Sequence, residues 1–149
     1  MRFTGTIEAK ADAKGRVFFP AMFRKVLASA GEEQLVLSRD AFQPCLVLYP
    51  RSVWDEQLDS LRAGLSRWNA RQQMIMREFV CDVEAVTLDG GGRFLIPKRY
   101  ATKVEIKQDV VFLGMDDTVE IWSPHLLEEQ RMPAEEFAKE LENLMNAPQ

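Results

Sequence analysis

Two short segments of this chain, residues 12–20 and 89–97, are near copies of each other. Each reads Asp-x-x-Gly-Arg, followed by three apolar residues and a proline, and the two copies lie 77 residues apart in a chain of 149. A shared pattern of this length indicates an internal duplication, so the fold must accommodate two related halves. Because a half of about 70 residues buries only a modest core, we expect the halves to pack together, to pair with other chains, or both.

The first four positions of each copy have the composition of a tight turn. An aspartate at the first position accepts hydrogen bonds from the turn's own backbone, and a glycine at the fourth adopts positive φ at little steric cost. Asp12 with Gly15, and Asp89 with Gly92, therefore predict a type I turn closed by a glycine bulge, a common connection between hairpin strands. We assign these four residues a loop-orienting role.

The segments around the turns repeat one order of elements. Apolar periodicity and turn residues predict, in the first half, strands at 3–11, 16–19, 34–38 and 45–49 with a helix from Pro20 to Gly31, whose apolar face is formed by Met22, Phe23, Val26 and Leu27. The second half predicts strands at 79–88, 94–96, 110–113 and 119–122 with a short helix at 98–104.

Two helices, at about 51–64 and 69–79, are predicted between the halves. An apolar seam runs along them, and Asn69 followed by Gln72 is typical of a helix start. The seam consists of Trp54, Leu58, Leu61, Leu65 and Trp68. An acidic helix is predicted at 133–146, with an apolar stripe that suits an interface helix or a loosely held tail.

These elements predict a mostly β fold with flanking helices, of the α+β class. We expect a first repeat over residues 3–60, a connecting helical segment over 61–79, a second repeat over 80–130, and an acidic helix or tail over 131–149.

Charge is unevenly distributed along the chain. The net charge of −4 argues weakly against nucleic acid, but residues 1–31 carry six basic and two acidic side chains, and residues 128–149 carry the reverse. Such a layout allows an acidic protein to present one basic face.

Several classes of protein find no support in the sequence. It contains no apolar run of 18 residues, so we expect no membrane span. The N-terminus lacks the apolar core of a signal peptide, and we expect a cytoplasmic protein. Cys45 and Cys81 are interpreted as reduced core residues, with a disulfide or redox pair as the minor alternative. With one histidine and no cysteine cluster, we expect no metal site, and no cofactor.

The paired motif, in a chain of this length, resembles the MraZ family of bacterial transcriptional regulators of the division and cell-wall gene cluster. Matching stretches are Pro-Cys-Leu-Val-Leu-Tyr-Pro at 44–50, Arg-Glu-Phe at 77–79 and Val-Glu-Ile-Trp at 119–122. Each half resembles the duplicated swapped-hairpin barrel of AbrB-type (SpoVT-AbrB) regulators. The resemblance covers essentially the whole chain except the acidic tail.

The resemblance implies a nucleoid-associated homo-oligomer, a ring of eight or more protomers, that binds double-stranded promoter DNA carrying direct repeats, including that of its own gene. The loops from Asp12 to Arg16 and from Asp89 to Arg93 would line the DNA-contacting side. Lys14 in the first loop corresponds to Gly91 in the second, so we expect the first loop to bind more tightly.

Four basic residues are therefore DNA-binding candidates: Arg16, Arg93, Lys14 and Arg2. An arginine just past a tight turn reaches phosphate oxygens or a guanine edge with two parallel hydrogen bonds, whereas a lysine on phosphate adds affinity without sequence information. The alternative reading is that each Asp–Arg pair only staples its hairpin. A further row, Arg62, Arg67, Arg71 and Arg77, is either a solvated face or an auxiliary phosphate-binding face.

Two competing functions remain open. In an enzyme, Asp12 and Asp89 would meet as a carboxylate pair sharing a proton, but the arginine beside each should keep both ionised. The sequence offers no nucleophile with its base and no phosphate-binding loop, so we expect no catalysis and no small-molecule substrate. The other alternative is an oligomeric protein-interaction scaffold without nucleic-acid binding.

Overall fold

The computed structural model describes residues 1–148, over which eight strands and six helices form. In chain order the elements are β1 (Thr6–Lys10), β2 (Arg16–Phe18), α1 (Ala21–Ser29), β3 (Leu35–Arg39), β4 (Leu46–Pro50), α2 (Arg51–Ala63), α3 (Ala70–Val80), β5 (Val83–Val86), β6 (Arg93–Leu95), α4 (Lys98–Lys103), β7 (Asp109–Met115), β8 (Thr118–Trp122), α5 (Pro124–Glu129) and α6 (Ala134–Met145). The α+β class and the predicted order of elements are confirmed.

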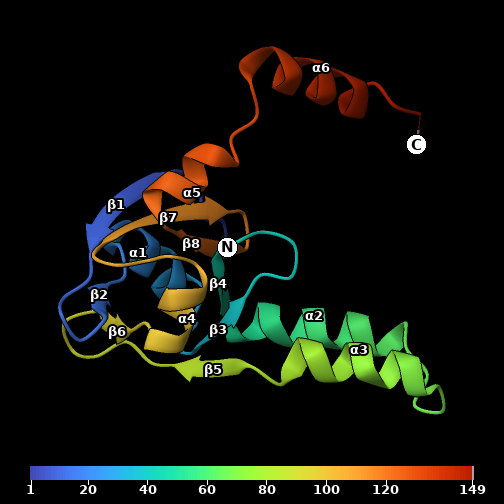
Figure 1. Ribbon diagram of the computed structural model, residues 1–149, viewed down its shortest axis with the longest axis horizontal. Coiled ribbons are helices and arrows are strands. Elements are labelled where there is room, and N and C mark those ends of the chain that lie inside the picture. Colours follow the sequence, from blue (N-terminus) through green and yellow to red (C-terminus); the bar gives the residue numbers. More distant parts are fainter. Residues whose placement is uncertain (149) are drawn as a thin grey trace.

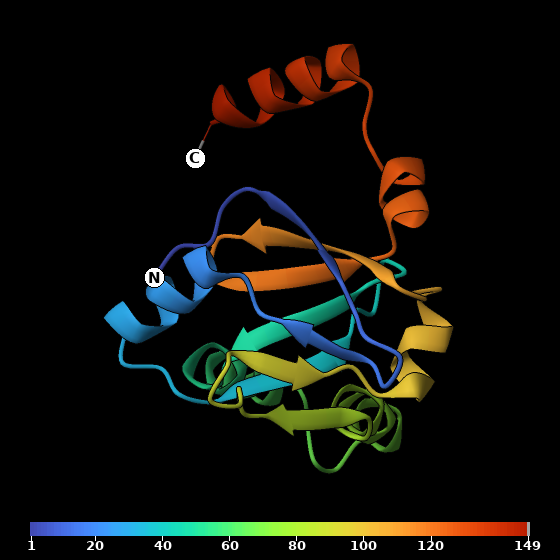
Figure 2. The same cartoon turned by 90° about the vertical axis from the view of Figure 1, so that its left-hand side faces the viewer.

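Strands of both halves lie in the same sheets and pair across the halves, so the halves interlock (Figures 1 and 2). The larger sheet has the order β1-β7-β8-β4-β3-β5, and β2 pairs with β6 in a separate two-stranded sheet. The first strand of each half pairs with the third strand of the other, as β1 with β7 and β5 with β3. Equivalent strands meet as β2 with β6 and β4 with β8. The expectation that the halves pack together is confirmed.

The predicted turns form, but the strands that they join do not pair with each other. The Asp12 N–H donates to the Arg16 carbonyl at 2.8 Å, which closes the turn. Beyond it β1 pairs with β7 and β2 with β6. The prediction that the turn joins two paired hairpin strands is therefore wrong. The strands are exchanged between the halves, which places the apolar side chains of both halves in one core.

The two-stranded sheet β2–β6 covers that core and turns its other face to solvent. Val17 and Phe94 point inward at 1% and 4% exposure, whereas Phe18 and Leu95 are 57% and 51% exposed. The Phe94 ring lies 6.2 Å from the ring of Phe112, which belongs to the larger sheet. Buried aromatic packing therefore anchors this ribbon, hereafter the β2–β6 ribbon, while its outer face stays free.

The helices α2 and α3 form a hairpin that projects from the body (Figure 1). The Asn69 side chain accepts from the Gln72 N–H at 3.0 Å, which confirms the predicted helix start. The hairpin is anchored at its base, where Trp54 is buried and stacks on Phe79 at 5.1 Å. Trp68 lies at the far end and is 97% exposed, so the predicted seam does not extend that far.

Two further burial predictions are wrong in part. Cys45 is buried as expected, but Cys81 is exposed because it lies at the junction of α3 and β5, outside the core; both are free thiols. On α1, Phe23 and Leu27 are buried, whereas Met22 is 52% exposed. The buried face of α1 is thus narrower than the periodicity indicates.

The last helix, α6, stands away from the body on a short link after α5 (Figures 1 and 2). None of its residues is buried. Over residues 1–148, no helix combines the length and the apolar character that crossing a bilayer requires.

Candidate nucleic-acid interface

The loops 12–16 and 89–93 share one geometry. In the first, Asp12 Oδ1 accepts from the backbone N–H groups of Lys14 and Arg16 at 2.9 and 3.0 Å, and its Oδ2 accepts from Arg16 Nε at 2.9 Å. In the second, Asp89 Oδ1 accepts from the N–H groups at positions 91 and 93, both at 2.9 Å, and its Oδ2 accepts from Arg93 Nε at 3.1 Å. Each carboxylate therefore holds its turn and its arginine together.

Both carboxylates are stabilised in their charged form. The backbone N–H of Arg16, then that of Lys14, lowers the pKa of Asp12 below its ordinary value, and the N–H of Arg93 does the same for the pKa of Asp89. Donors to the ionised form lower a carboxyl pKa, which is the opposite of what a shared-proton pair needs. The geometry thus suits positioning rather than acid–base chemistry.

The two arginines are oriented by one nitrogen and keep the others available. Arg16 and Arg93 each donate through Nε to their aspartate, and their terminal Nη groups have no hydrogen-bond partner within residues 1–148. The side chains are 43% and 39% exposed. A guanidinium held in this way presents its outer nitrogens, with a fixed direction, to an incoming acceptor.

Each loop is also fixed by the opposite half. The Gly15 carbonyl accepts from the N–H of Ile96 at 2.9 Å, and the Gly92 carbonyl accepts from the N–H of Phe19 at 2.9 Å. The two glycines have φ of +90° and +85°, a region that favours glycine. The loop-orienting role expected of the aspartates and glycines thus has a physical basis in these contacts.

The outer face of the β2–β6 ribbon combines the two arginines with two apolar side chains. Arg16 lies opposite Leu95, and Phe18 lies opposite Arg93. The Arg93 Cζ is 5.8 Å from the centre of the Phe18 ring, within the range of a cation–π contact. The ribbon therefore presents two guanidinium groups, diagonally placed, with apolar contacts beside each.

The second loop has a brace that the first lacks. Arg24 of α1 donates through Nη1 to the Gly91 carbonyl at 3.3 Å, while its Nε is buried without a partner within residues 1–148. The equivalent position in the second half, 77 residues on, is Ala101. The sequence signal for this brace is an arginine in one copy without a counterpart in the other.

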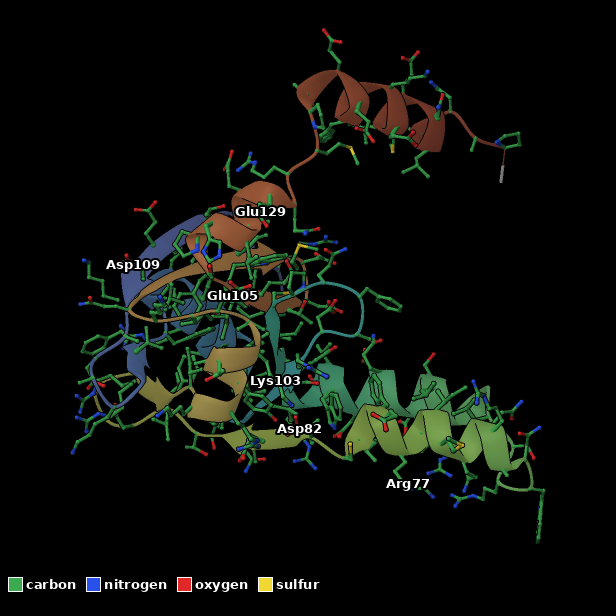
Figure 3. All side chains as sticks on the ribbon, in the orientation of Figure 1. Arg77, Asp82, Lys103, Glu105, Asp109 and Glu129 are labelled. Atoms are coloured by element: carbon green, nitrogen blue, oxygen red, sulfur yellow. The ribbon has the colours of Figure 1, made fainter. Side chains whose placement is uncertain are left out.

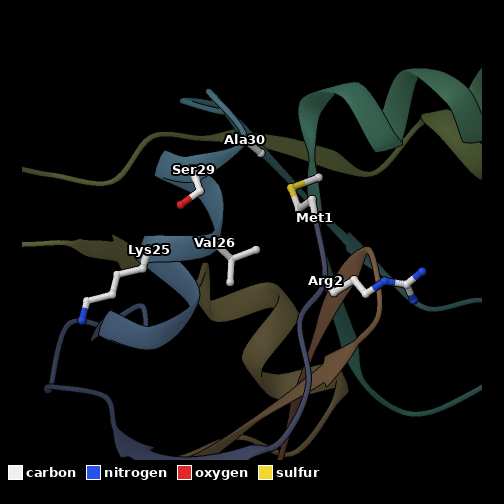
Figure 4. A pocket seen from close by; sticks show the side chains of 6 residues that line it. All are labelled: Met1, Arg2, Lys25, Val26, Ser29 and Ala30. Atoms are coloured by element: carbon white, nitrogen blue, oxygen red, sulfur yellow. The ribbon is translucent and has the colours of Figure 1, made fainter.

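Arg2 is not brought to the loops. It forms an ion pair with Asp116 at 2.9 Å, at the end of β1 opposite the first loop, and both side chains are largely exposed. Arg2 and Lys25 also line a hollow between the N-terminal segment and α1, together with Met1, Val26, Ser29 and Ala30 (Figure 4). The two charged side chains point away from each other there, so the hollow has no convergent charged groups.

A serine, a histidine and a glutamate lie in a row near α5. Ser123 Oγ is 2.7 Å from His125 Nδ1, and His125 Nε2 is 3.4 Å from Glu105 Oε1. This order of groups is that of a catalytic triad, but Ser123 is only 1% exposed, so its hydroxyl is out of reach of a substrate. Over residues 1–148 no three potential metal ligands are grouped.

Comparison with known proteins identifies the family. The model of the family described as "MraZ protein, putative antitoxin-like" matches residues 2–78 and 81–146. The chain is 59% identical over 145 residues to "Transcriptional regulator MraZ" of Phocaeicola vulgatus, covering 97% of this chain and 94% of that one. It is 53% identical to the protein of that name in Bacteroides thetaiotaomicron (98% and 94% covered) and 31% identical to that of Nitrosococcus oceani (93% and 92% covered). This chain therefore belongs to the MraZ family of transcriptional regulators.

Proposed function

We propose that the protein is a sequence-specific regulator that binds repeated elements of promoter DNA through the β2–β6 ribbon and its two loops. The observation that carries the proposal is the state of Arg16 and Arg93. In both, Nε is engaged by the loop aspartate while the Nη groups are unpartnered on an exposed face. An arginine that only stabilised its turn would not need exposed Nη groups without partners, yet the arginines of both halves have them.

The shape of the site suits duplex DNA. The major groove admits a two-stranded β-ribbon, and arginine reads guanine through its O6 and N7 atoms. Phe18 and Leu95, exposed beside the arginines, suit contact with thymine methyl groups. Lys14, which forms no ion pair within residues 1–148, supplies a phosphate contact in the first loop only.

Assembly compensates for the few contacts of a single protomer. With a net charge of −4 and two short loops, one protomer has little electrostatic attraction for DNA. In a homo-oligomeric ring, protomers engage neighbouring repeats together, and tethering raises the effective concentration of each loop. We infer a cytoplasmic, nucleoid-associated ring of eight or more protomers that acts at the division and cell-wall gene cluster, including its own promoter.

The proposal is tested by a gel shift with the protein's own upstream region. We expect Arg16→Ala to abolish specific binding and Arg93→Ala to weaken it, because each well-placed bidentate contact contributes about 1–3 kcal/mol of discrimination. Arg51→Ala is the matched control, because Arg51 pairs with Asp55 on α2, outside the ribbon. Binding of the Arg16→Ala protein at wild-type affinity would contradict the proposal.

A salt titration tests the inequality of the loops. Each phosphate contact contributes about −0.9 to the slope of log affinity against log salt. Lys14→Ala should reduce this slope, and Gly91→Ala should leave it unchanged, because a Cβ at Gly91 meets only ordinary contacts at 3.5 Å and beyond. Equal slopes for the two variants would show that the loops are equivalent. Absence of any salt-dependent binding would favour the protein-interaction scaffold instead.

A further inference from the structure

Helix α6 carries an apolar stripe with nothing packed on it. Phe137, Leu141, Leu144 and Met145 are 49%, 46%, 74% and 77% exposed. Their spacing places them along one face of the helix, and Glu140 and Glu142 flank Leu141 on the two sides of the stripe. No ion pair within residues 1–148 involves these glutamates. We call this surface the acidic stripe.

The α2–α3 hairpin carries the opposite combination, from its tip along α3. Four arginines there, with no acidic residue between the first and the last, take part in no ion pair over the described chain: Arg62, Arg67, Arg71 and Arg77. Trp68, Met74 and Ile75 are exposed among them, at 97%, 51% and 48%. Met74 is three residues from both Arg71 and Arg77, so it lies between them on one helical face. This surface is the arginine patch, and Figure 3 shows Arg77 on its outer side.

We propose that the acidic stripe of one protomer packs on the arginine patch of a second copy of the chain. The proposal rests on the homo-oligomer of the proposed function and names the surfaces that build it. Helix α6 has four glutamates and one lysine, whereas residues 62–77 have four arginines and no acid. Each surface also presents exposed apolar side chains, so the contact satisfies charge and apolar area together.

The occupant is another copy, because α6 is separated from the arginine patch of its own chain. In both views α6 is at the top of the molecule and the α2–α3 hairpin at the bottom (Figures 1 and 2), and the link from α5 to α6 spans only residues 130–133. DNA is the poorer occupant of the patch, since phosphates would satisfy the arginines but leave Met74, Ile75 and Trp68 without apolar contacts.

The two surfaces are different, which determines the kind of assembly. Contacts between unlike patches are heterologous, and they generate closed rings when the rotation between neighbours closes. Each protomer then contributes α6 to one neighbour and receives α6 from the other. The β2–β6 ribbon takes no part in this contact and stays available on every protomer.

A charge exchange between two variants tests the proposal. The first variant carries Glu140→Lys and Glu142→Lys, and the second carries Arg71→Glu and Arg77→Glu; all four side chains are exposed. Each variant alone should have a lower mass by light scattering after gel filtration than the wild type, because like charges then face each other. An equimolar mixture should recover the wild-type mass, since each reversed surface meets a complementary one. Circular dichroism checks that the variants are folded, and Glu128→Lys with Glu129→Lys, on α5, is the matched control and should keep the wild-type mass.

Several results would overturn the proposal. A mixture that stays at low mass, or single variants that keep the wild-type mass, would show that these surfaces do not join protomers, as expected if α6 folded onto its own chain. Loss of DNA affinity by the Arg71→Glu, Arg77→Glu variant at unchanged mass would assign the patch to DNA. A wild-type ring unaffected by the variants would leave the proposed function intact, whereas a monomeric wild type would refute the ring itself.

Discussion

Replacing a loop glycine by alanine should be more costly in the first loop than in the second. At both Gly15 and Gly92 the positive φ costs an alanine about 1–2 kcal/mol. A Cβ at Gly15 would lie 2.8 Å from the Ile96 carbonyl oxygen, which is backbone of the other half. That segment must shift, which weakens the hydrogen bond from Ile96 to Gly15 and adds about 0.5–1.5 kcal/mol.

At Gly92 the added Cβ meets a side chain instead. Its near neighbours are guanidinium and side-chain atoms of Arg24, which can swing toward solvent and give up only the contact with Gly91. We therefore expect a loss of about 2–3 kcal/mol for Gly15→Ala and about 1–2 kcal/mol for Gly92→Ala.

Urea unfolding at one fixed protomer concentration measures the difference. With a slope of about 1–3 kcal/mol per molar urea, 1 kcal/mol separates the two midpoints by about 0.3–1 M. Gly90→Ala is the control, because it has no positive φ and a Cβ there meets nothing within 4 Å. Equal losses for Gly15→Ala and Gly92→Ala would mean that turn conformation alone fixes the first loop. They would refute a contribution from the hydrogen bond between Ile96 and Gly15.

Three further predictions concern single groups. Tyr100→Phe should lower the free energy of unfolding by about 1–2 kcal/mol in urea, because the buried Tyr100 hydroxyl donates to the Asp82 carbonyl at 2.7 Å; an unchanged midpoint would contradict this. The lowered pKa values of Asp12 and Asp89 give stability that is present above pH 3.8 and is lost as the pH falls through the folded-state pKa. The double variant Asp12→Asn, Asp89→Asn should therefore lose less stability than the wild type on acidification. If the urea midpoints of the two proteins fell by the same amount with pH, the effect would be excluded. A thiol reagent should label one cysteine of the native protein and none after Cys81→Ser, since the other thiol is buried; two labelled thiols would contradict the fold.

What the sequence predicts well is local. The turns follow from an aspartate and a glycine three residues apart, whose conformational preferences act within the loop itself. The helix start at Asn69 likewise depends on neighbouring residues. The part of the candidate site that depends on the turn, the Asp–Arg contact, could therefore be expected in both copies.

What the sequence does not predict depends on contacts between the halves. Nothing near β1 indicates that its partner is β7 rather than β2, because either pairing satisfies the same alternation. The brace from Arg24 to Gly91 needs residues that the exchanged strands bring together. The DNA-binding roles of Arg16, Arg93, Lys14 and Arg2 remain predictions.

The interlocked halves have the arrangement that two copies of a single repeat would form as a symmetric homodimer. In such a dimer every substitution appears twice, at two equivalent places. Joining the copies in one chain removes that constraint, and Lys14 opposite Gly91, or Arg24 opposite Ala101, are substitutions present on one side only. Covalent fusion thus gives the molecule a direction: the β2–β6 ribbon has two distinguishable ends, so the DNA binding proposed for it would discriminate between the two orientations of an asymmetric target.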